Sequence, residues 1–399
     1  MTDVGANSKP RWTGRFGRIV ALAAAATLGA CATVVPKGPP PPVSGPVVRP
    51  QPVPDGPIQP GIPQDTARHR VALLVPLSGG NAGVGTSIAN ATQLALLDLN
   101  TDKVRITSYD TAGGAAAAAQ RALADGNRLI LGPLLAEDVR AVAPIARAGG
   151  VPLIAFSNDT AVAGRGTFVM GYSPAQAIAR VVNYARGTGV ANFAGLIPNG
   201  LYGERASTAL LRAVEGANGQ VVSLQTYDRA PGSIAAAVSR LAKNSPYQAI
   251  LIADGGAPAS AAVPLVRRNG GAGARILGTE LWNSESGVAG RPALAGAWFA
   301  SVPDTLYRQF AAKYRARFGV SPYRLASLGY DAVLLTVRVA RDWRVGNAFP
   351  TEALNDRGGF AGIDGAFRFG RDAVAERALE VQEIRGGTAI TVSPAPTGF

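Results

Sequence analysis

Polar and small residues follow several apolar runs of the sequence, where they could line a binding cleft. Hydroxyl, amide, carboxylate and phenol groups of this kind orient small polar ligands. The residues that we select are Ser78, Gly79, Ser157, Asn158, Tyr202, Asp254 and Glu280. Structural roles stay open for several of them. Ser157 and Asn158 could cap a following turn, Tyr202 could simply pack in its loop, and Glu280 could be a solvated charge.

Residues for catalysis are scarce. The 399 residues include one histidine, His69, and one cysteine, Cys31, so neither a histidine-dependent triad nor a zinc cluster is expected. The glycines between Gly79 and Gly85 lack the lysine and the spacing of nucleotide-binding loops. Composition leaves a glycosidase with two carboxylates open, but no carboxylate pair stands out. We therefore predict no enzymatic activity, no metal and no cofactor.

The N-terminal segment has the layout of a secretory signal. Basic residues precede an uncharged apolar run, residues 19–30, which is too short to span a bilayer. The sequence Leu28-Gly29-Ala30-Cys31 resembles the lipobox of bacterial lipoproteins, which implies cleavage of residues 1–30 and lipidation of Cys31. The alternative is that Cys31 only ends an apolar stretch. In that group an aspartate after the cysteine favours the inner membrane. Ala32 stands there instead, which implies the periplasmic face of the outer membrane.

Residues 31–67 form a proline-rich linker in this interpretation. Twelve prolines lie between Pro36 and Pro63, a composition that favours an extended chain and cannot bury a core. At ~3.1 Å per residue such a segment reaches roughly 100 Å, although it could equally be a linker whose length has no use. Without residues 1–30 the formal charge falls from +13 to +10. Because the chain is exported and its cations are scattered, no nucleic-acid partner is expected.

Beyond residue 68, apolar runs alternate with helical patterns, which predicts an α/β fold with mainly parallel sheets. This part has about 330 residues. A single hydrophobic core rarely supports a chain of that length, so two lobes are expected. We expect strands at 70–76, 104–109, 128–131, 152–156, 192–197, 220–227, 249–253 and 275–278, and helices at 87–99, 115–124, 137–148, 174–186, 203–216, 233–243 and 258–268. Ligands of such sheets bind at the carboxyl ends of the strands, where the selected residues lie.

Several motifs in order resemble the type I periplasmic binding proteins, in particular the leucine/isoleucine/valine-binding receptors. They are Val75-Pro-Leu-Ser-Gly79, Asp110-Thr-Ala-Gly-Gly114, Leu131-Gly-Pro133, Pro152-Leu-Ile-Ala-Phe-Ser157, Tyr202-Gly-Glu204, and Phe360-Ala-Gly-Ile-Asp-Gly365 with Phe367-Arg-Phe369. The resemblance implies a two-lobed binding domain, 68–399, with three crossovers near Tyr172, Ala300 and Phe349. Lobe I would then hold residues 68–172 and 301–348, and lobe II residues 173–300 and 349–395.

The same resemblance implies roles for the selected residues. Ser78 and Gly79 lie on the first loop, and Ser157 and Asn158 match the position after the fourth strand that holds a ligand carboxylate. Tyr202 matches an aromatic gate, and Glu280 matches the acid that meets a ligand ammonium. The third-strand loop departs from the receptor pattern. It reads Gly132-Pro-Leu-Leu-Ala136, with apolar side chains where a hydroxyl is expected.

The lipobox, the long linker and the altered loop together resemble the penicillin-binding protein activators. The stretches 132–135 and 360–377 are also similar to that group. This resemblance implies a non-catalytic lipoprotein that activates a peptidoglycan synthase. The partners would be a membrane through the lipid and the synthase, with a small-molecule ligand in the interlobe cleft as an option. The alternative is a solute-binding lipoprotein of an ABC transporter for amino acids or related small molecules.

Overall fold

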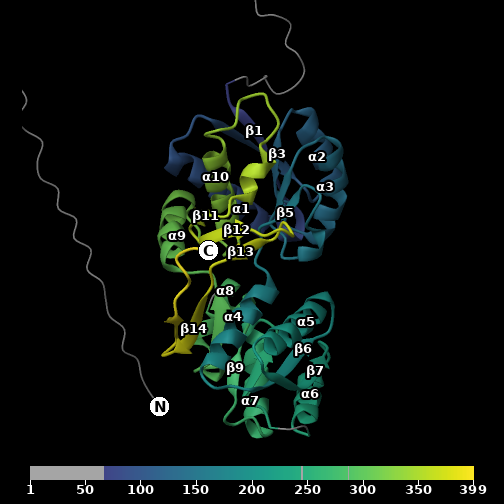
Figure 1. Cartoon of the computed structure of the whole chain (residues 1–399), viewed down its shortest axis with the longest axis vertical. Helices are drawn as coiled ribbons and strands as arrows, with labels where there is room; N and C mark the ends of the chain where they lie inside the picture. The colour runs from purple at the N-terminus through teal and green to yellow at the C-terminus, as the bar shows by residue number, and fades with distance from the viewer. Residues whose placement is uncertain (1–66, 244–245, 286) are drawn as a thin grey trace, which may run out of the picture. The chain divides into compact units, whose positions relative to one another are not determined.

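The computed structural model describes residues 67–243, 246–285 and 287–399, which form two α/β lobes (Figure 1). The expected signal peptide, the lipidation site Cys31 and the proline-rich linker up to residue 66 lie outside the described residues. Within the described part, no helix is both long and apolar enough to cross a membrane.

Lobe I is built on a parallel sheet with the strand order β2-β1-β3-β4-β5. Its strands are β1 (His69–Val75), β2 (Val104–Asp110), β3 (Leu129–Leu131), β4 (Leu153–Ala155) and β5 (Thr167–Val169). Helices α1 (Ala82–Leu99) and α10 (Ala326–Val339) cover one face, and α2 (Ala115–Ala124) and α3 (Ala136–Ala148) cover the other. Helix α9 (Thr305–Phe318) packs on α1. Both faces are buried, which explains the uninterrupted apolar run of β1.

Lobe II has a sheet with the order β15-β14-β10-β9-β8-β6-β7. Its strands are β6 (Asn192–Pro198), β7 (Gln220–Tyr227), β8 (Ala249–Ile252), β9 (Arg275–Leu277), β10 (Trp298–Ser301), β14 (Glu380–Arg385) and β15 (Thr388–Ser393). Strands β6 to β10 run parallel, and the C-terminal hairpin β14–β15 adds antiparallel to β10. Helices α4 (Pro174–Gly187) and α5 (Leu201–Gly216) cover one face, and α6 (Ser233–Leu241) and α7 (Gly256–Arg268) the other.

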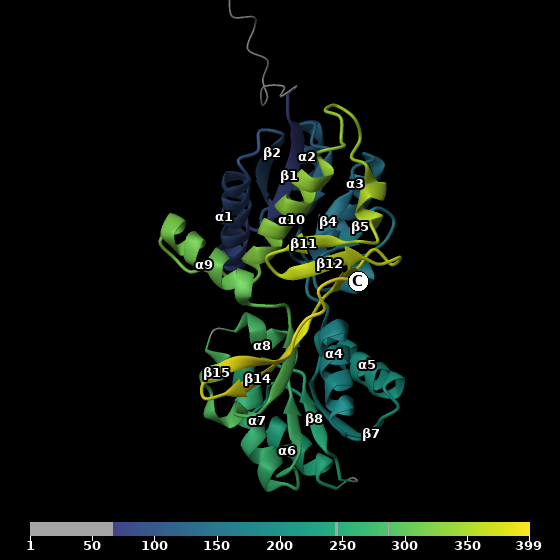
Figure 2. The ribbon, with the colours of Figure 1, turned by 60° about the vertical axis from the view of Figure 1, so that its left-hand side comes forward.

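The third crossover was expected near Phe349, and this is wrong. Residues after α10 stay with lobe I, where they form a small antiparallel sheet of β11 (Phe360–Gly362), β12 (Gly365–Phe369) and β13 (Ala375–Arg377). The side chains of Phe360, Phe367 and Phe369 are buried in the lobe I core, and Figure 2 shows β11 and β12 beside α10. The chain reaches the lobe II sheet only at β14. Residues 349–377 therefore belong to lobe I, and the crossovers lie at 170–173, 302–304 and 378–379.

A glycine near the start of one helix in each lobe positions the predicted site loops. A Cβ on Gly85 of α1 would collide with the carbonyl oxygen of Pro76, and a Cβ on Gly203 of α5 would collide with that of Pro198. The helices can therefore begin directly against the ends of β1 and β6. This close approach fixes the loop that carries Ser78 and the turn that carries Tyr202.

Candidate functional site

The first loop of lobe I is held by the end of the neighbouring strand. The hydroxyl of Ser78 donates to Asp110 Oδ2 at 2.6 Å, and the backbone N–H of Leu77 donates to Asp110 Oδ1 at 2.8 Å. These hydrogen bonds stabilise the carboxylate and so lower the pKa of Asp110. The hydrogen bond from Ser78 has the largest effect. The carboxylate therefore holds the loop, and the Ser78 hydroxyl is already engaged within lobe I.

The loop after β4 makes an ionic contact between the two lobes. The Ser157 hydroxyl is buried and accepts from the backbone N–H of Asp159 at 3.1 Å. The Asp159 carboxylate binds Arg140 of α3 and Arg205 of α5, each at 2.6 Å. Burial opposes ionisation, yet the hydrogen bond from Arg205 keeps the pKa of Asp159 below its usual range. Ser157 and Asn158 are predicted site residues, whereas Asp159, which follows them directly, is not.

Tyr202 and Glu280 lie together in lobe II. The Tyr202 hydroxyl lies 3.0 Å from Thr279 Oγ1 and 3.1 Å from Glu280 Oε1. Glu280 is 7% exposed, and its Oε2 atom has no hydrogen-bond partner among the described residues. Burial without a cationic partner raises the pKa of Glu280 to about 7. The carboxyl is therefore poised to gain or lose a proton near neutral pH.

Asp254 has a structural role in lobe II. Its carboxylate accepts from the Tyr227 hydroxyl at 2.6 Å and pairs with Arg229 at 2.8 Å. Its backbone oxygen accepts from Trp282 Nε1 at 2.8 Å. These contacts tie the loop after β8 to β7 and to α8 (Leu281–Ser284). The Asp254 carboxylate therefore contacts lobe II groups, which fix this loop.

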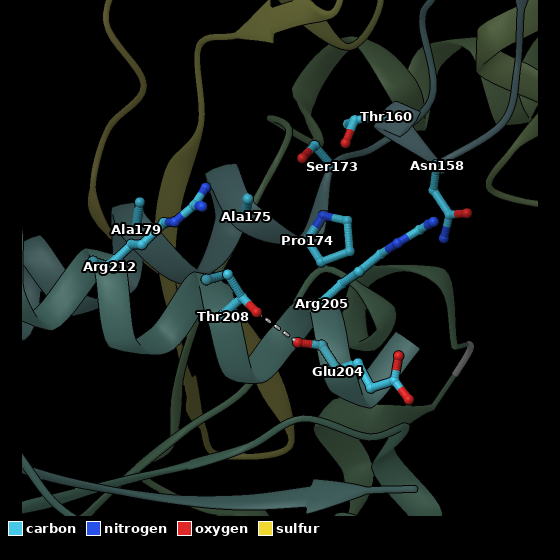
Figure 3. Close-up of a pocket in the computed structure, with 12 residues that line it drawn as sticks. Asn158, Thr160, Ser173, Pro174, Ala175, Ala179, Glu204, Arg205, Thr208 and Arg212 are labelled. Carbon is cyan, nitrogen blue, oxygen red and sulfur yellow. Dashed lines mark hydrogen bonds between the residues drawn. The ribbon is translucent and has the colours of Figure 1, made fainter. Parts of the chain in front are cut away.

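A cavity of about 530 Å³ is lined by residues of both lobes. The Arg205 side chain extends toward Asn158 at one side of it, and Arg212 lies at the other (Figure 3). Ser173 at the start of α4 also lines the cavity. Its volume is in the range that small-molecule sites occupy. Of the residues selected from the sequence, Asn158 alone is part of this lining; a second, much smaller cavity includes Glu280.

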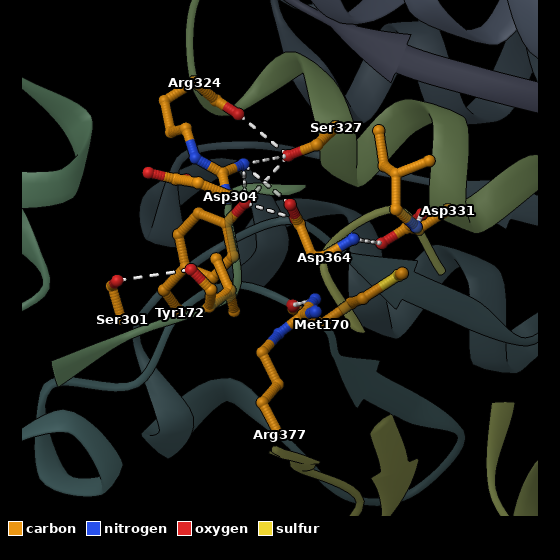
Figure 4. Close-up of polar contacts among 11 residues, drawn as sticks. Met170, Tyr172, Ser301, Asp304, Arg324, Ser327, Asp331, Asp364 and Arg377 are labelled. Atoms are coloured by element: carbon orange, nitrogen blue, oxygen red, sulfur yellow. Dashed lines mark hydrogen bonds and ion pairs between the residues drawn. The ribbon is translucent and has the colours of Figure 1, made fainter. Parts of the chain in front are cut away.

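A buried polar network joins the segments that connect the lobes (Figure 4). Arg324, just before α10, pairs with Asp364 at 2.7 Å, and the Tyr172 hydroxyl donates to the other oxygen of Asp364 at 2.6 Å. Arg377 donates to the backbone oxygen of Met170 at 2.6 Å. Asp304 lies 3.6 Å from Arg324. Each of the three crossovers is therefore next to, or part of, one network.

Two buried carboxyl groups at this network, Asp364 and Asp331, differ in the direction of their pKa shift. Burial disfavours the charge on Asp364, but Arg324 and Arg377 lower its pKa overall. Asp331 is also fully buried, and burial together with the charge on Asp364 raises its pKa. The surroundings therefore favour the ionised form of Asp364 and the neutral form of Asp331. Tyr172, Arg324 and Asp364 are far apart in the chain, so the sequence does not indicate that they form one group.

Metal binding has no support in the described part of the chain. Among those residues, no cluster of three or more His, Cys, Asp or Glu side chains is placed to hold a metal ion. The groups that the site does offer are hydrogen-bond donors, acceptors and paired charges, which are suited to binding.

Comparison with known proteins identifies the family. The profile of the periplasmic binding proteins matches residues 69–389. The chain belongs to the periplasmic binding protein family. The two α/β lobes and their three crossovers are those of the type I branch of this superfamily. As a periplasmic binding protein, the chain carries its predicted polar loops at the carboxyl ends of its parallel strands.

Solved structures share this periplasmic binding protein fold at low sequence identity. A protein described as a branched-chain amino acid ABC transporter from Rhodospirillum rubrum has a TM-score of 0.72 and 22% identity, over 82% of this chain and 100% of that one. LivJ from Streptococcus pneumoniae, solved with isoleucine, has a TM-score of 0.60 and 19% identity, over 82% and 100%. Full-length LpoA from Haemophilus influenzae has a TM-score of 0.62 and 19% identity, over 83% and 60%.

One curated relative matches part of the periplasmic binding domain. An uncharacterised protein of Rickettsia prowazekii (strain Madrid E) is 28% identical over 177 residues, which are 44% of this chain and 47% of the relative. The match thus spans about half the length of that relative.

Proposed function

We propose that the protein is a non-catalytic envelope lipoprotein whose binding-protein domain activates a peptidoglycan synthase. A lipid on Cys31 would hold it at the periplasmic face of the outer membrane, and residues 31–67 would give it reach toward an inner-membrane partner. The family and the fold are compatible with this role, and the resemblance of the sequence to penicillin-binding protein activators favours it.

One observation carries the proposal: polar groups that a receptor would offer to an amino acid are engaged by the protein itself. Ser78 donates to Asp110, and Tyr202 is bonded to Glu280. The loop after β3 has no hydroxyl, and Leu134 packs against the lobe I core. A ligand carboxylate entering here would compete with existing hydrogen bonds, each worth about 0.5–1.5 kcal/mol net. This arrangement favours a protein partner over a free amino acid.

The contacts between the lobes support the same proposal. Solute receptors use lobe movement to enclose a ligand, whereas here Asp159 of lobe I and Arg205 of lobe II are joined directly by an ion pair of 2.6 Å. The network around Arg324 and Asp364 adds buried, hydrogen-bonded charge at the connections. A domain held in this way presents a constant surface, which suits recognition by another protein.

Two experiments test the proposal: binding to a synthase in vitro, and function in cells after the linker is shortened. The purified mature chain should retain a bifunctional penicillin-binding protein in a pull-down. Deletion of residues 39–60 should leave this binding intact and impair function in cells, because the shortened linker no longer spans the distance. Replacement of the same segment by a Gly/Ser segment of equal length is the matched control. A chain that retains no synthase under any condition would refute the activator role.

A solute-binding role for an ABC transporter is the second candidate. The Oε2 atom of the buried Glu280 favours it, because this oxygen has no hydrogen-bond partner among the described residues and the receptor resemblance places Glu280 at the ligand ammonium. In that case branched-chain amino acids should raise the melting temperature of the mature chain. Glu280→Ala should abolish that shift, while Asp228→Ala, an exposed acid of the same lobe, should leave it unchanged.

A further inference from the structure

One edge of the lobe II sheet is an exposed strand, β15. It ends the sheet, and among the described residues it pairs with β14 alone. Residues 388–391 of this strand are all exposed, and the Ile390 side chain is 41% exposed. Figure 2 shows β15 at the margin of lobe II. A strand in this position presents backbone N–H and C=O groups with which another strand can pair.

The register of the hairpin shows which backbone groups of β15 point outward. The backbone N–H of Ile384 donates to Ala297 O at 3.0 Å, and its C=O accepts from Gly296 N–H at 2.7 Å. The backbone of Ile384 therefore faces β10 and not β15. Ala389 lies opposite Ile384, so the N–H and C=O of Ala389 point away from β14. Because the direction alternates along a strand, those of Thr391 point away as well.

These outward groups are complementary to themselves. When two copies of β15 pair antiparallel about a two-fold axis at Ile390, Ala389 of each copy lies opposite Thr391 of the other. Each such pair exchanges two backbone hydrogen bonds, so the two pairs make four. In the same register the two Ile390 side chains are direct cross-strand neighbours, which adds an apolar contact on the axis.

The absence of charge at this edge permits a second copy. The chain has a formal net charge of +13, yet residues 386–399 contain no charged side chain. Like charges directly opposite each other destabilise a strand pair, and pairing of β15 with itself brings none together. Natural edge strands usually carry charges or prolines that prevent such pairing. Strand β15 has neither.

The opposite edge of the same sheet, β7, is protected by a side chain. Arg240 of α6 donates to the backbone oxygen of Thr226 at 2.9 Å and to Gln225 Oε1 at 2.8 Å. Within the described part of the chain, no side chain is seen to donate to the backbone of β15. The proline-rich segment 36–63 of the same chain is a poor strand partner, because proline has no N–H to donate. A second copy of β15 supplies both donors and acceptors.

We propose that β15 is a dimerisation edge, at which two copies of this chain join their lobe II sheets into one continuous sheet. The same strand is used on both copies, as in other two-fold symmetric dimers. Six residues of each copy form the strand, which makes a small interface. We therefore expect a reversible dimer that forms at high protein concentration. The inference does not depend on a synthase or on a ligand.

The first test measures the dimer constant by sedimentation equilibrium. It uses the chain from residue 31 onward with Cys31→Ala, which removes the lipid and the native thiol. Thr391→Pro removes one outward N–H from each copy, and therefore two of the four hydrogen bonds, so the dimer should weaken about tenfold or more. Thr391→Val keeps the N–H and is the matched control, with a change below about twofold. Circular dichroism checks that both variants are folded.

A second test uses a disulfide and does not rely on proline. In the proposed register the Cα atoms of the two Ile390 residues lie about 4.5 Å apart, within the range that a disulfide spans. Mild oxidation of Ile390→Cys, in the Cys31→Ala chain, should therefore give a covalent dimer. Leu211→Cys is the control, because Leu211 is 49% exposed on α5 and away from β15. It should form the disulfide about tenfold more slowly or not at all.

Three results would overturn the proposal. The chain could stay monomeric at every concentration, or Ile390→Cys could form a disulfide no faster than Leu211→Cys. A dimer that Thr391→Pro leaves unchanged would use another surface. If the chain is monomeric and Thr391→Pro instead abolishes binding to a penicillin-binding protein, the edge pairs with that protein and not with a second copy.

Discussion

Two buried carboxyl groups, Glu280 in lobe II and Asp364 at the lobe connections, have different partners and different charges. Glu280 meets the neutral Tyr202 hydroxyl, and burial raises its pKa to about 7. Asp364 is fully buried, yet its ion pair with Arg324 at 2.7 Å and the nearby Arg377 keep its pKa low. Burial alone therefore does not determine whether a carboxyl group is ionised. The charge of the neighbouring side chain decides between these two groups.

The comparison separates two kinds of site. A buried carboxyl with a neutral partner and a free oxygen can change its protonation or accept a ligand at modest cost. A buried carboxylate with two guanidinium groups is part of the framework, since removal of either side leaves an uncompensated charge. Lobe II thus keeps an adaptable polar group, while the connections between the lobes are fixed.

The largest effect is expected from Asp364→Asn. The substitution removes the charge that neutralises Arg324, and loss of one partner of a buried pair costs about 3–5 kcal/mol of unfolding free energy. Urea unfolding measures this value. The control is Lys313→Ala, which breaks the exposed pair with Asp98 and should cost less than about 1 kcal/mol. Similar losses for both variants would contradict a special role of the connections.

A smaller, pH-dependent effect is expected at Glu280. Its pKa rises from the ordinary 4.5 to about 7 on folding, so the folded state binds the proton more tightly than the unfolded state. The stability from this group is complete below pH ~4.5 and is lost as the pH rises toward about 7, by up to about 3 kcal/mol.

Unfolding of Glu280→Gln and of the unchanged chain should be measured across this pH range. The variant should lack the decline, because glutamine does not titrate. A decline of equal size in both proteins would assign the pH dependence to other groups.

Tyr172→Phe comes next in size. It removes the hydroxyl that donates to Asp364 and lies 2.8 Å from Ser327 Oγ, and loss of a hydrogen bond to a charged group costs about 1.5–3 kcal/mol. Tyr323→Phe, on an exposed ring, is the matched control and should stay within about 0.5 kcal/mol. Thermal unfolding of both variants gives the difference.

The smallest effect is expected from Asp331→Asn, although Asp331 is as buried as Asp364. Its raised pKa favours the neutral carboxyl, and the amide oxygen of asparagine can still accept from the backbone N–H of Ile363 at 2.7 Å. The substitution should therefore cost less than about 1 kcal/mol. A loss comparable with that of Asp364→Asn in urea unfolding would show that Asp331 is ionised in the folded protein.

The sequence predicted the alternating part of the fold well. Strands such as β1 and β6 are uninterrupted apolar runs, and local patterns are sufficient to recognise them. The short strands β11–β13 were placed in the wrong lobe. The phenylalanines of these strands indicate that one face of the small sheet is buried. The pattern does not indicate whether that face packs into the core of lobe I or of lobe II. That choice depends on packing against α10 and on Phe168, which lies 5.1 Å from Phe369 between ring centroids.

The candidate site was predictable only in part. The resemblance to receptors gave Tyr202 and Glu280 separate roles and did not predict the hydrogen bond between them. Asp254 was selected for its position in a loop, but its contacts with Tyr227 and Arg229 are structural. The network of Tyr172, Arg324 and Asp364 gives no local signal, since its members come from three distant segments that meet only in the folded chain.

The central claim, activation of a peptidoglycan synthase, is tested most directly by the glycan polymerisation rate of a purified bifunctional penicillin-binding protein. The rate should rise and saturate as the mature chain is added, and an excess of leucine should not alter the effect. If the rate stays unchanged at every concentration while leucine binds to the chain and Glu280→Ala abolishes that binding, the protein is a solute receptor and the activator account is wrong.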